Sequence, residues 1–307
     1  MNACLRAVVR TGIAEGLNVF GIRYGYEGMI DGEIFPMDVH SVANIIHRGG
    51  TILKTARSKR FLTEAGRAAA KTQLEKHGIE GVVAIGGDGT FRGAVEFSKI
   101  CGIPFVGCPG TIDNDLAGTD YTIGFDTALN TVVDAVDKIR DTAESHNRVF
   151  VVEVMGRDAG LLALYSGIGV GAEGILIPET KNDLQTVLNR LGKSRSSKSS
   201  KIIIVAEGDE SGGAFKVSEK IKELFPQLDV RVSILGHIQR GGSPSCMERV
   251  NASRMGFAAV KALLDGRRQV MIGIVNRAIS FTPFEEAVKH LQEPDPALMK
   301  MIGVLAR

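Results

Sequence analysis

A glycine-rich run with one acid, Gly86-Gly87-Asp88-Gly89-Thr90, comes directly after the apolar stretch Gly81–Ile85. Glycines let a backbone approach phosphate oxygens closely, and a helix that starts here would point its amino end at the anion. Asp88 could then hold a magnesium ion. The alternative is a tight strand-to-helix turn with Asp88 as the N-cap, which would be favoured for any GGDG standing alone.

Two aspartates two residues apart, Asp113 and Asp115, follow Pro109-Gly110-Thr111 after the apolar stretch Pro104–Gly107. The segment is too polar for a core, and an extended backbone would direct both carboxylates the same way. One carboxylate could take a proton from an attacking hydroxyl while the other orders magnesium. The alternative, an Asx-turn, is disfavoured because both acids occur together with Thr111.

A basic side chain, Arg157, follows the apolar stretch Val149–Val154 within Met155-Gly156-Arg157-Asp158. Its guanidinium could neutralise charge on a transferring phosphoryl group, whereas the alternative is an ordinary ion pair with Asp158 at a helix cap. Four more basic residues lie in or beside strand-like stretches: Arg148, Arg231, His237 and Arg240. Each alone is more often a surface charge or a satisfied histidine, so the prediction rests on their recurrence at one sheet edge. Two anion sites and paired acids indicate phosphoryl transfer between a nucleotide and a phosphorylated acceptor.

Strand-like apolar stretches alternate with amphipathic helical ones along most of the chain. The predicted strands are Leu17–Ile22, Gly81–Ile85, Pro104–Gly107, Val149–Met155, Gly174–Ile177, Lys201–Ala206, Val230–Leu235 and Val270–Val275. The clearest predicted helices are Thr63–His77, Asp126–Glu144, Asp183–Leu191 and Cys246–Leu264. This alternation predicts an α/β fold, a mostly parallel sheet with helices on both faces, and ligands beyond the carboxyl ends of the strands.

Composition excludes several classes of protein. The 307 residues carry 37 Lys and Arg against 35 Asp and Glu, a net charge of +2, so the chain offers no polycation for nucleic acid. The longest uncharged stretch, Ala159–Ala172, is well short of the roughly 20 residues that span a bilayer. The cysteines form no CxxC pair, which fits reduced thiols in a cytoplasm: Cys4, Cys101, Cys108 and Cys246. The length predicts two domains.

Three further segments are given plain interpretations. Gly169–Gly174 satisfies GxGxxG, but it follows a helical pattern and precedes a strand, so we predict a helix-to-strand turn. Gly192–Lys201, rich in serine and basic residues, predicts a solvated surface loop. Histidines and cysteines are too scattered for a zinc site, so any metal must bind to carboxylates.

These motifs together resemble bacterial-type ATP-dependent 6-phosphofructokinases over nearly the whole chain. GGDGT alone is weak, since NAD kinases and lipid kinases share it, but PGTIDND (109–115) with MGR (155–157) and GHIQRGG (236–242) is highly specific. Further matches are Gly25-Tyr26-Glu27-Gly28, Arg48-Gly49-Gly50-Thr51, Gly118-Thr119-Asp120, Pro178-Glu179 and Ala252-Ser253-Arg254-Met255-Gly256. The resemblance implies two similar three-layer Rossmann-like domains with the site in the cleft. The ATP-binding domain would comprise residues 1–124 and about 238–287, and the fructose 6-phosphate domain residues 125–237 and 288–307.

The resemblance also implies a role for each matching residue. Asp113 would deprotonate the sugar 1-hydroxyl, with Thr111 beside the transferred group and Asp115 nearby, and Arg157 would stabilise the γ-phosphoryl. ATP and Mg²⁺ would be bound by Arg57, Gly87, Asp88, Gly89 and Thr90, with Asp88 the magnesium-associated acid. The sugar would be bound by Met155, Gly156 and Glu207, and its 6-phosphate by His237 and Arg240. Arg148 and Arg231 would reach that phosphate from a neighbouring subunit, which implies a cooperative homotetramer.

Donor and effector choice can be interpreted in the same way. Pyrophosphate-using relatives carry an Asp in place of Gly89 and a Lys in place of Gly110; such an acid would repel a nucleotide α-phosphate, so the two glycines favour ATP. The family's effector site for ADP or phosphoenolpyruvate matches Arg6, Arg10, Arg140, Glu173 and Lys198. Val39 and Ser196 replace an arginine and a lysine of that site, so regulation could be weaker or use another ligand. The alternative for Arg6 and Arg10 is a solvated helix face.

The largest departure from the family is at the start of the chain. Family members place a strand and a Gly-Gly-Asp-x-Pro-Gly loop, which cradles the nucleotide phosphates, before the residues that match Met1-Asn2-Ala3, whereas this sequence begins inside a helical pattern. We expect the natural chain to begin upstream, because Arg57, Asp88 and Gly89 are kept. The alternative is a non-catalytic phosphofructokinase-like subunit. We expect little or no activity from the printed chain, with recovery when the segment is restored. A third possibility is another acceptor, such as sedoheptulose 7-phosphate.

Overall fold

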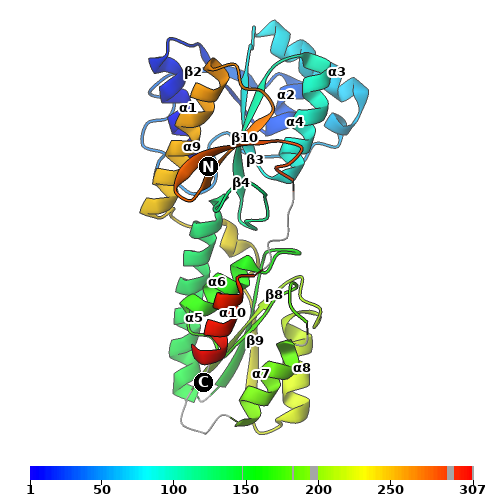
Figure 1. Ribbon diagram of the computed structural model, residues 1–307, viewed down its shortest axis with the longest axis vertical. Coiled ribbons are helices and arrows are strands. Elements are labelled where there is room, and N and C mark those ends of the chain that lie inside the picture. The colour runs from blue at the N-terminus through cyan, green and yellow to red at the C-terminus, as the bar shows by residue number, and fades with distance from the viewer. Residues whose placement is uncertain (147, 182, 194–199, 289–293, 306–307) are drawn as a thin grey trace. The chain divides into compact units, whose positions relative to one another are not determined.

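The computed structural model describes residues 1–305 except 147, 182, 194–199 and 289–293. The chain forms two compact units (Figure 1). Unit 1 comprises Met1–Thr111, Leu116–Gly124 and Ser243–His290, and unit 2 comprises Ile112–Asp115, Phe125–Gly242 and Leu291–Arg307. The predicted division differs from this one in three respects, since 112–115 and 238–242 belong to unit 2 and 288–290 belong to unit 1.

Unit 1 is built on a sheet with the strand order β11-β10-β4-β3. β3 (Val82–Gly86), β4 (Phe105–Thr111) and β10 (Val270–Val275) are parallel, β11 (Ala278–Pro283) is antiparallel to β10, and the short β5 (Ile123–Gly124) pairs with the end of β4. Successive side chains of a strand point to opposite faces. Met271 of β10 therefore packs in one apolar core and Ile272 in another.

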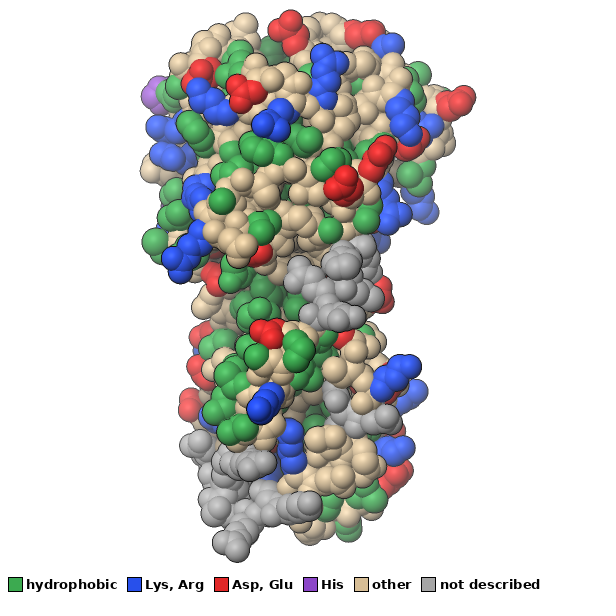
Figure 2. All heavy atoms as spheres, in the orientation of Figure 1, with side chains coloured by type: hydrophobic (Ala, Val, Ile, Leu, Met, Phe, Trp, Pro, Cys, Tyr) green, Lys and Arg blue, Asp and Glu red, His purple; other side chains and the backbone are tan. Residues whose placement is uncertain are grey.

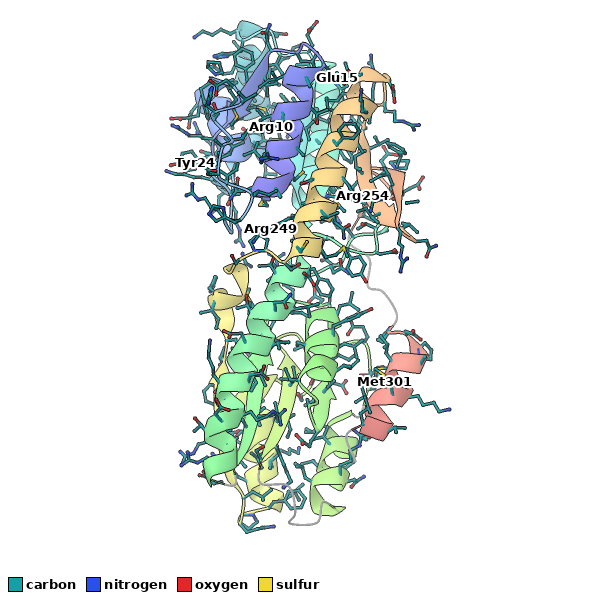
Figure 3. The ribbon with its side chains drawn as sticks, turned by 90° about the vertical axis from the view of Figure 1, so that its left-hand side faces the viewer. Arg10, Glu15, Tyr24, Arg249, Arg254 and Met301 are labelled. Carbon is teal, nitrogen blue, oxygen red and sulfur yellow. The ribbon has the colours of Figure 1, made fainter. Side chains whose placement is uncertain are left out.

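Helices cover both of these faces. α3 (Glu64–Lys76) and α4 (Asp88–Cys101) supply the core on one side, and α1 (Asn2–Ala14) and α9 (Cys246–Leu264) the core on the other. Figure 3 shows α1 lying alongside α9, and Lys261 of α9 forms an ion pair of 2.6 Å with Glu15 at the end of α1. A separate two-stranded antiparallel sheet, β1 (Val19–Ile22) with β2 (Ile34–Met37), flanks α2 (Gly25–Asp31).

Unit 2 contains a fully parallel sheet with the order β7-β8-β6-β9. Its strands are β6 (Arg148–Val154), β7 (Gly174–Leu176), β8 (Lys201–Ala206) and β9 (Asp229–Ile234). One face packs on α5 (Phe125–His146) and α6 (Leu161–Gly169), the other on α7 (Asp183–Lys193) and α8 (Gly213–Leu224). In β8, Ile202 and Ile204 face the first core while Ile203 and Val205 face the second, so the strand is apolar throughout because both faces are buried. The 3₁₀ helix η2 (Gly236–Arg240) and α10 (Pro296–Leu305) complete the unit.

The predicted α/β class with mostly parallel sheets is confirmed, and every predicted strand and helix is present. Gly169–Gly174 is the predicted turn between α6 and β7. Two expectations are wrong in detail. Of the predicted strand Leu17–Ile22, only Val19–Ile22 is a strand, and it lies in the small antiparallel sheet. The predicted loop Gly192–Lys201 is shorter because Gly192 and Lys193 end α7 and the buried Lys201 starts β8. The rest of that segment, 194–199, lies outside the described residues.

Within the described part of the chain, no helix is both long and apolar enough to cross a bilayer. Each unit displays acidic as well as basic side chains on the face shown in Figure 2.

Candidate functional site

The carboxyl edge of the unit 2 sheet brings together most of the predicted substrate residues. Because β6, β8 and β9 are parallel, the residues that follow them emerge at one edge. Met155, Gly156 and Arg157 follow β6, Glu207 follows β8, and His237 and Arg240 lie in η2 after β9. Glu207, His237 and Arg240 are exposed at this edge, and Met155 is buried.

Asp113 and Arg157 form an ion pair within unit 2. The distance between Arg157 Nε and Asp113 Oδ2 is 3.8 Å, and the exposed fractions of the two side chains are 55% and 9%. A buried carboxylate is therefore paired with a guanidinium that solvent or a substrate can reach. This arrangement provides a proton acceptor beside a group that stabilises developing negative charge.

The segment that carries Asp113 differs from the sequence-based expectation. It was expected to be extended and too polar for a core, but Asp113, Asn114 and Asp115 are only 6%, 4% and 7% exposed, and Asn114 has a left-handed φ of 53°. The predicted common direction of the two carboxylates, which required extended backbone, therefore loses its basis. Asparagine tolerates the left-handed region better than most residues, which explains its place between the acids.

Two side chains at this edge were not singled out as site residues from the sequence. Gln239, 1% exposed, accepts a hydrogen bond at Oε1 from Met155 N (3.1 Å). Glu179, which follows β7, accepts one at Oε1 from Gly160 N (2.6 Å). Both lie in motifs that carried the family resemblance, GHIQRGG and Pro178-Glu179, and those motifs were the available signal.

Arg148 and Arg231 do not lie at the carboxyl edge, so the prediction that all these basic residues share one sheet edge is wrong. Arg148 is the first residue of β6, and Arg231 lies near the start of β9. Both pair with Asp229, at 2.7 Å from Arg148 Nε and 2.9 Å from Arg231 Nε. The hydrogen bond from Arg148, reinforced by Arg231, lowers the pKa of the Asp229 carboxyl. The two guanidiniums thus form a cluster at the amino edge.

In unit 1 the GGDGT run forms the junction between β3 and α4, as predicted. The N-cap of α4 is Gly87, not Asp88, and no side chain caps this end. Gly86 must be glycine because a Cβ there would lie 2.2 Å from Thr90 Oγ1, whereas a Cβ on Gly89 would meet nothing within 4 Å. An uncapped helix amino end beside open space suits an anion.

Three more predicted or neighbouring side chains lie in unit 1. Thr111 ends β4, and its carbonyl accepts a hydrogen bond from Thr122 Oγ1 (2.7 Å). Arg57 is exposed in the irregular segment between β2 and η1 (Arg60–Leu62). Tyr26, whose pKa is raised by burial, donates from its hydroxyl to the carbonyl of Thr90 (2.6 Å) and so ties α2 to the first turn of α4.

Asp88 could bind a magnesium ion only as a single protein carboxylate, with the other ligands supplied by water and substrate. Its Oδ1 lies 2.9 Å from Arg92 Nε, and its side chain is 26% exposed. Among the residues that the structure describes, no group of three or more His, Cys, Asp or Glu side chains could hold a metal. Mg²⁺ in phosphoryl-transfer sites keeps waters and substrate phosphates as most of its ligands, so a single carboxylate is compatible with it.

The predicted effector residues are divided between the two units. Arg6 and Arg10 lie on α1 of unit 1, with Arg10 exposed (Figure 3). In unit 2, Glu173 is 8% exposed and accepts from Ile202 N (2.6 Å), while Arg140 donates to the carbonyl of Val170. Lys198 lies outside the described residues. Glu173 and Arg140 therefore already have structural partners.

A model of the phosphofructokinase family matches residues 1–263, and the chain belongs to this family. It is 56% identical over 307 residues to ATP-dependent 6-phosphofructokinase 1 of Thermus thermophilus, covering 100% of this chain and 95% of that protein. It is 54% identical over 289 residues to the ATP-dependent 6-phosphofructokinase of Cytophaga hutchinsonii, covering 94% of this chain and 88% of that protein. The resemblance inferred from the motifs is thereby confirmed.

Solved structures give the same fold. Phosphofructokinase from Saccharomyces cerevisiae matches with a TM-score of 0.88 and 37% identity over 94% of this chain, which spans 43% of the yeast chain. A pyrophosphate-dependent phosphofructokinase from Marinobacter aquaeolei matches with a TM-score of 0.84 and 20% identity, over 99% of this chain and 88% of that one, and shows the fold alone.

Proposed function

We propose that this protein transfers the γ-phosphoryl group of ATP to the 1-hydroxyl of D-fructose 6-phosphate, giving ADP and fructose 1,6-bisphosphate, the committed step of glycolysis. The observation that carries the proposal is the pairing of buried Asp113 with half-exposed Arg157, 3.8 Å apart. The names of the curated relatives, ATP-dependent 6-phosphofructokinases at 50% to 56% identity, support it.

On the acceptor side, Asp113 takes the proton of the 1-hydroxyl as its oxygen attacks, and Arg157 stabilises the charge that spreads over the phosphoryl oxygens. Thr111 and Asp115 flank the base in the chain. Met155, Gly156 and Glu207 orient the sugar, and His237 and Arg240 bind its 6-phosphate. Their convergence after β6, β8 and β9 supports this assignment.

On the donor side, Gly87, Asp88, Gly89 and Thr90 bind the ATP phosphates at the amino end of α4, with Arg57 as a further cation. Mg²⁺, associated with Asp88, would neutralise charge on the phosphates. The open space around the Gly89 Cβ position supports a nucleotide over pyrophosphate, since nothing in the fold itself demands glycine there.

The proposal includes a homotetramer, in which Arg148 and Arg231 would reach the 6-phosphate of a neighbouring copy. β6 is seven residues long, so its ends are six steps of about 3.3 Å, or roughly 20 Å, apart. Arg148, at the amino end of β6, therefore lies too far from the carboxyl edge to bind the same phosphate as His237 of its own chain, which supports assigning this role to a second copy. Effector control by ADP or phosphoenolpyruvate through Arg6, Arg10, Arg140, Glu173 and Lys198 remains part of this proposal. Four unbridged cysteines support a reducing, cytoplasmic setting.

The test is ADP release with fructose 6-phosphate, measured on the 307-residue chain and on a form extended upstream in frame. In whichever form turns over, Asp113→Ser should lower kcat by orders of magnitude with a modest change in sugar affinity. Unchanged turnover would remove Asp113 from the mechanism. Sugar-phosphate binding without turnover in both forms would favour the non-catalytic subunit, and faster turnover of sedoheptulose 7-phosphate would change the acceptor.

A further inference from the structure

Three side chains hold the loop from Met155 to Gly160, and one of them follows each of the other three strands of the unit 2 sheet. Gln239 after β9, Glu207 after β8 and Glu179 after β7 each accept a hydrogen bond from a backbone N–H of the loop. The donors are Met155 N (3.1 Å), Arg157 N (2.8 Å) and Gly160 N (2.6 Å), respectively. We propose that these three side chains form a clamp that sets the position of Arg157, and that Gln239 and Glu179 are positioning residues for phosphoryl transfer. The proposal rests on the proposed function.

The loop needs such a clamp because its backbone is unusual. Arg157 has a left-handed φ of 56°, and Gly156 before it has a φ of 139°. A non-glycine residue is uncommon in the left-handed region and persists where the surrounding structure over-determines its conformation. The three hydrogen bonds, which are made by the backbone N–H groups of Met155, Arg157 and Gly160, provide that constraint. They direct the half-exposed guanidinium to Asp113 without occupying it.

Gln239 also links the loop to the predicted phosphate-binding turn. Its Nε2 donates to the carbonyl of Gly236 (3.0 Å), and its side chain is 1% exposed. Gln239 lies between His237 and Arg240 in η2, so these two side chains and the backbone of Met155 are held by one buried amide. Binding of the sugar 6-phosphate to η2 would therefore affect the position of Arg157 through Gln239 and the backbone of Met155.

Glu179 holds the other end of the loop. Gly160 is the N-cap of α6 and has no side-chain cap of its own, so the Glu179 carboxylate supplies an acceptor at this helix amino end. The second oxygen, Oε2, is buried and accepts no hydrogen bond from the residues that the structure describes. A Cβ on Gly160 would lie 2.3 Å from that oxygen, so glycine and glutamate are matched at this contact.

The experiment is a pair of double-mutant cycles with Arg157→Ala, scored by kcat for ADP release. Gln239→Leu and Glu179→Leu should each lower kcat by about 30- to 100-fold, because a misplacement of about 1 Å in a catalytic group has effects of that order. In the Arg157→Ala background the same substitutions should cost at most about threefold, since the group they position is gone. Glu179→Gln keeps an acceptor and should recover most of the activity.

The controls separate a positioning role from a general loss of structure. Gln185→Leu, an exposed glutamine of α7, should leave kcat unchanged. Backbone amide exchange in the peptide covering 155–160 should accelerate in the two leucine variants and stay slow in Glu179→Gln. If a leucine variant does not fold, the cycle is run with Gln239→Met or Glu179→Asp.

The outcomes distinguish the two proposals. Equal losses in the Arg157 and Arg157→Ala backgrounds, or unchanged kcat and exchange in the leucine variants, would overturn the clamp. Wild-type kcat in Arg157→Ala itself would overturn the proposed role of Arg157 in the reaction, and amide exchange would then still decide whether the clamp holds the loop.

Discussion

The substitution Gly208→Ala adds one methyl group against the Arg157 backbone, and it should impair phosphoryl transfer while leaving nucleotide binding intact. Gly208 directly follows Glu207, and a Cβ on it would lie 1.9 Å from the Arg157 carbonyl oxygen and 2.9 Å from its carbonyl carbon. Real Cβ atoms essentially never come within 3.0 Å of such atoms, so in Gly208→Ala the new Cβ and the Arg157 carbonyl oxygen must separate by about 1.1 Å, which displaces the backbone at this contact. The contact is with backbone, which no rotamer change relieves.

The size of the effect follows from that displacement. The Arg157–Asp113 distance of 3.8 Å is already close to the limit for an ion pair, so a shift of this size disrupts it. A misplacement of about 1 Å can cost about 100-fold in rate, and we expect this loss in kcat with the KM for ATP within about twofold of wild type. Steady-state ADP release at saturating ATP and varied sugar phosphate measures both quantities.

Gly169→Ala is the matched control for this variant. Gly169 ends α6 in the same unit, and a Cβ there would meet only Val133 Cγ2, at an ordinary 3.6 Å. It should keep wild-type kcat and thermal stability. Wild-type kcat in a folded Gly208→Ala protein would refute the link between the Arg157 backbone and catalysis.

Three further perturbations test other parts of the molecule. Gly89→Asp should fold normally, since nothing lies within 4 Å of its Cβ position, but should raise the KM for ATP by about tenfold or more through charge repulsion; unchanged ATP kinetics would contradict the assignment. Tyr26→Phe removes the hydrogen bond from the Tyr26 hydroxyl to the partly buried carbonyl of Thr90, so the free energy of unfolding should fall by about 0.5–1.5 kcal/mol in thermal or urea denaturation, and an unchanged midpoint would count against it. Arg148 lowers the pKa of Asp229, so this pair stabilises the folded protein. The stabilisation is fully present above the pKa of about 3.9 that the carboxyl has in the unfolded chain, and it is lost as the pH falls through the lower pKa of the folded protein. Asp229→Asn should therefore be less stable than wild type at pH 6 and equally stable at acid pH, which denaturation at both pH values would check.

The main elements could be predicted from the sequence because burial on both sheet faces leaves a plain signal. Ile202–Val205 is apolar at every position since the strand packs on helices from both sides. β2 and β11 gave no such signal: β2 has four residues and includes Pro36, and β11 is partly exposed along its length. Short, half-exposed edge strands lack the continuous apolar run that marked the others.

The candidate site was predictable only in part. The residues after β6, β8 and β9 were identified because parallel strands deliver their carboxyl ends to one edge. The same rule places Arg148 and Arg231 at the opposite edge, since both come early in their strands, and the predicted strand bounds already indicated this. Gln239 and Glu179 act through single bonds to backbone groups 84 and 19 residues away, and a contact of that kind leaves no periodic pattern in the sequence.

Under the proposed function, the ion pair of Asp113 and Arg157 also explains how the charge of the buried carboxylate is balanced during the reaction. The Asp113 side chain is only 9% exposed, and its carboxylate needs favourable partners because burying an unpaired ion is costly. Arg157 supplies that charge in the resting protein, yet its exposed guanidinium is the group that must turn to the phosphoryl oxygens. Departure of Arg157 while Asp113 remained charged would remove this ion pair from the buried carboxylate. The proton that Asp113 takes from the sugar hydroxyl neutralises it in the same step, so departure of the guanidinium and acceptance of the proton favour each other.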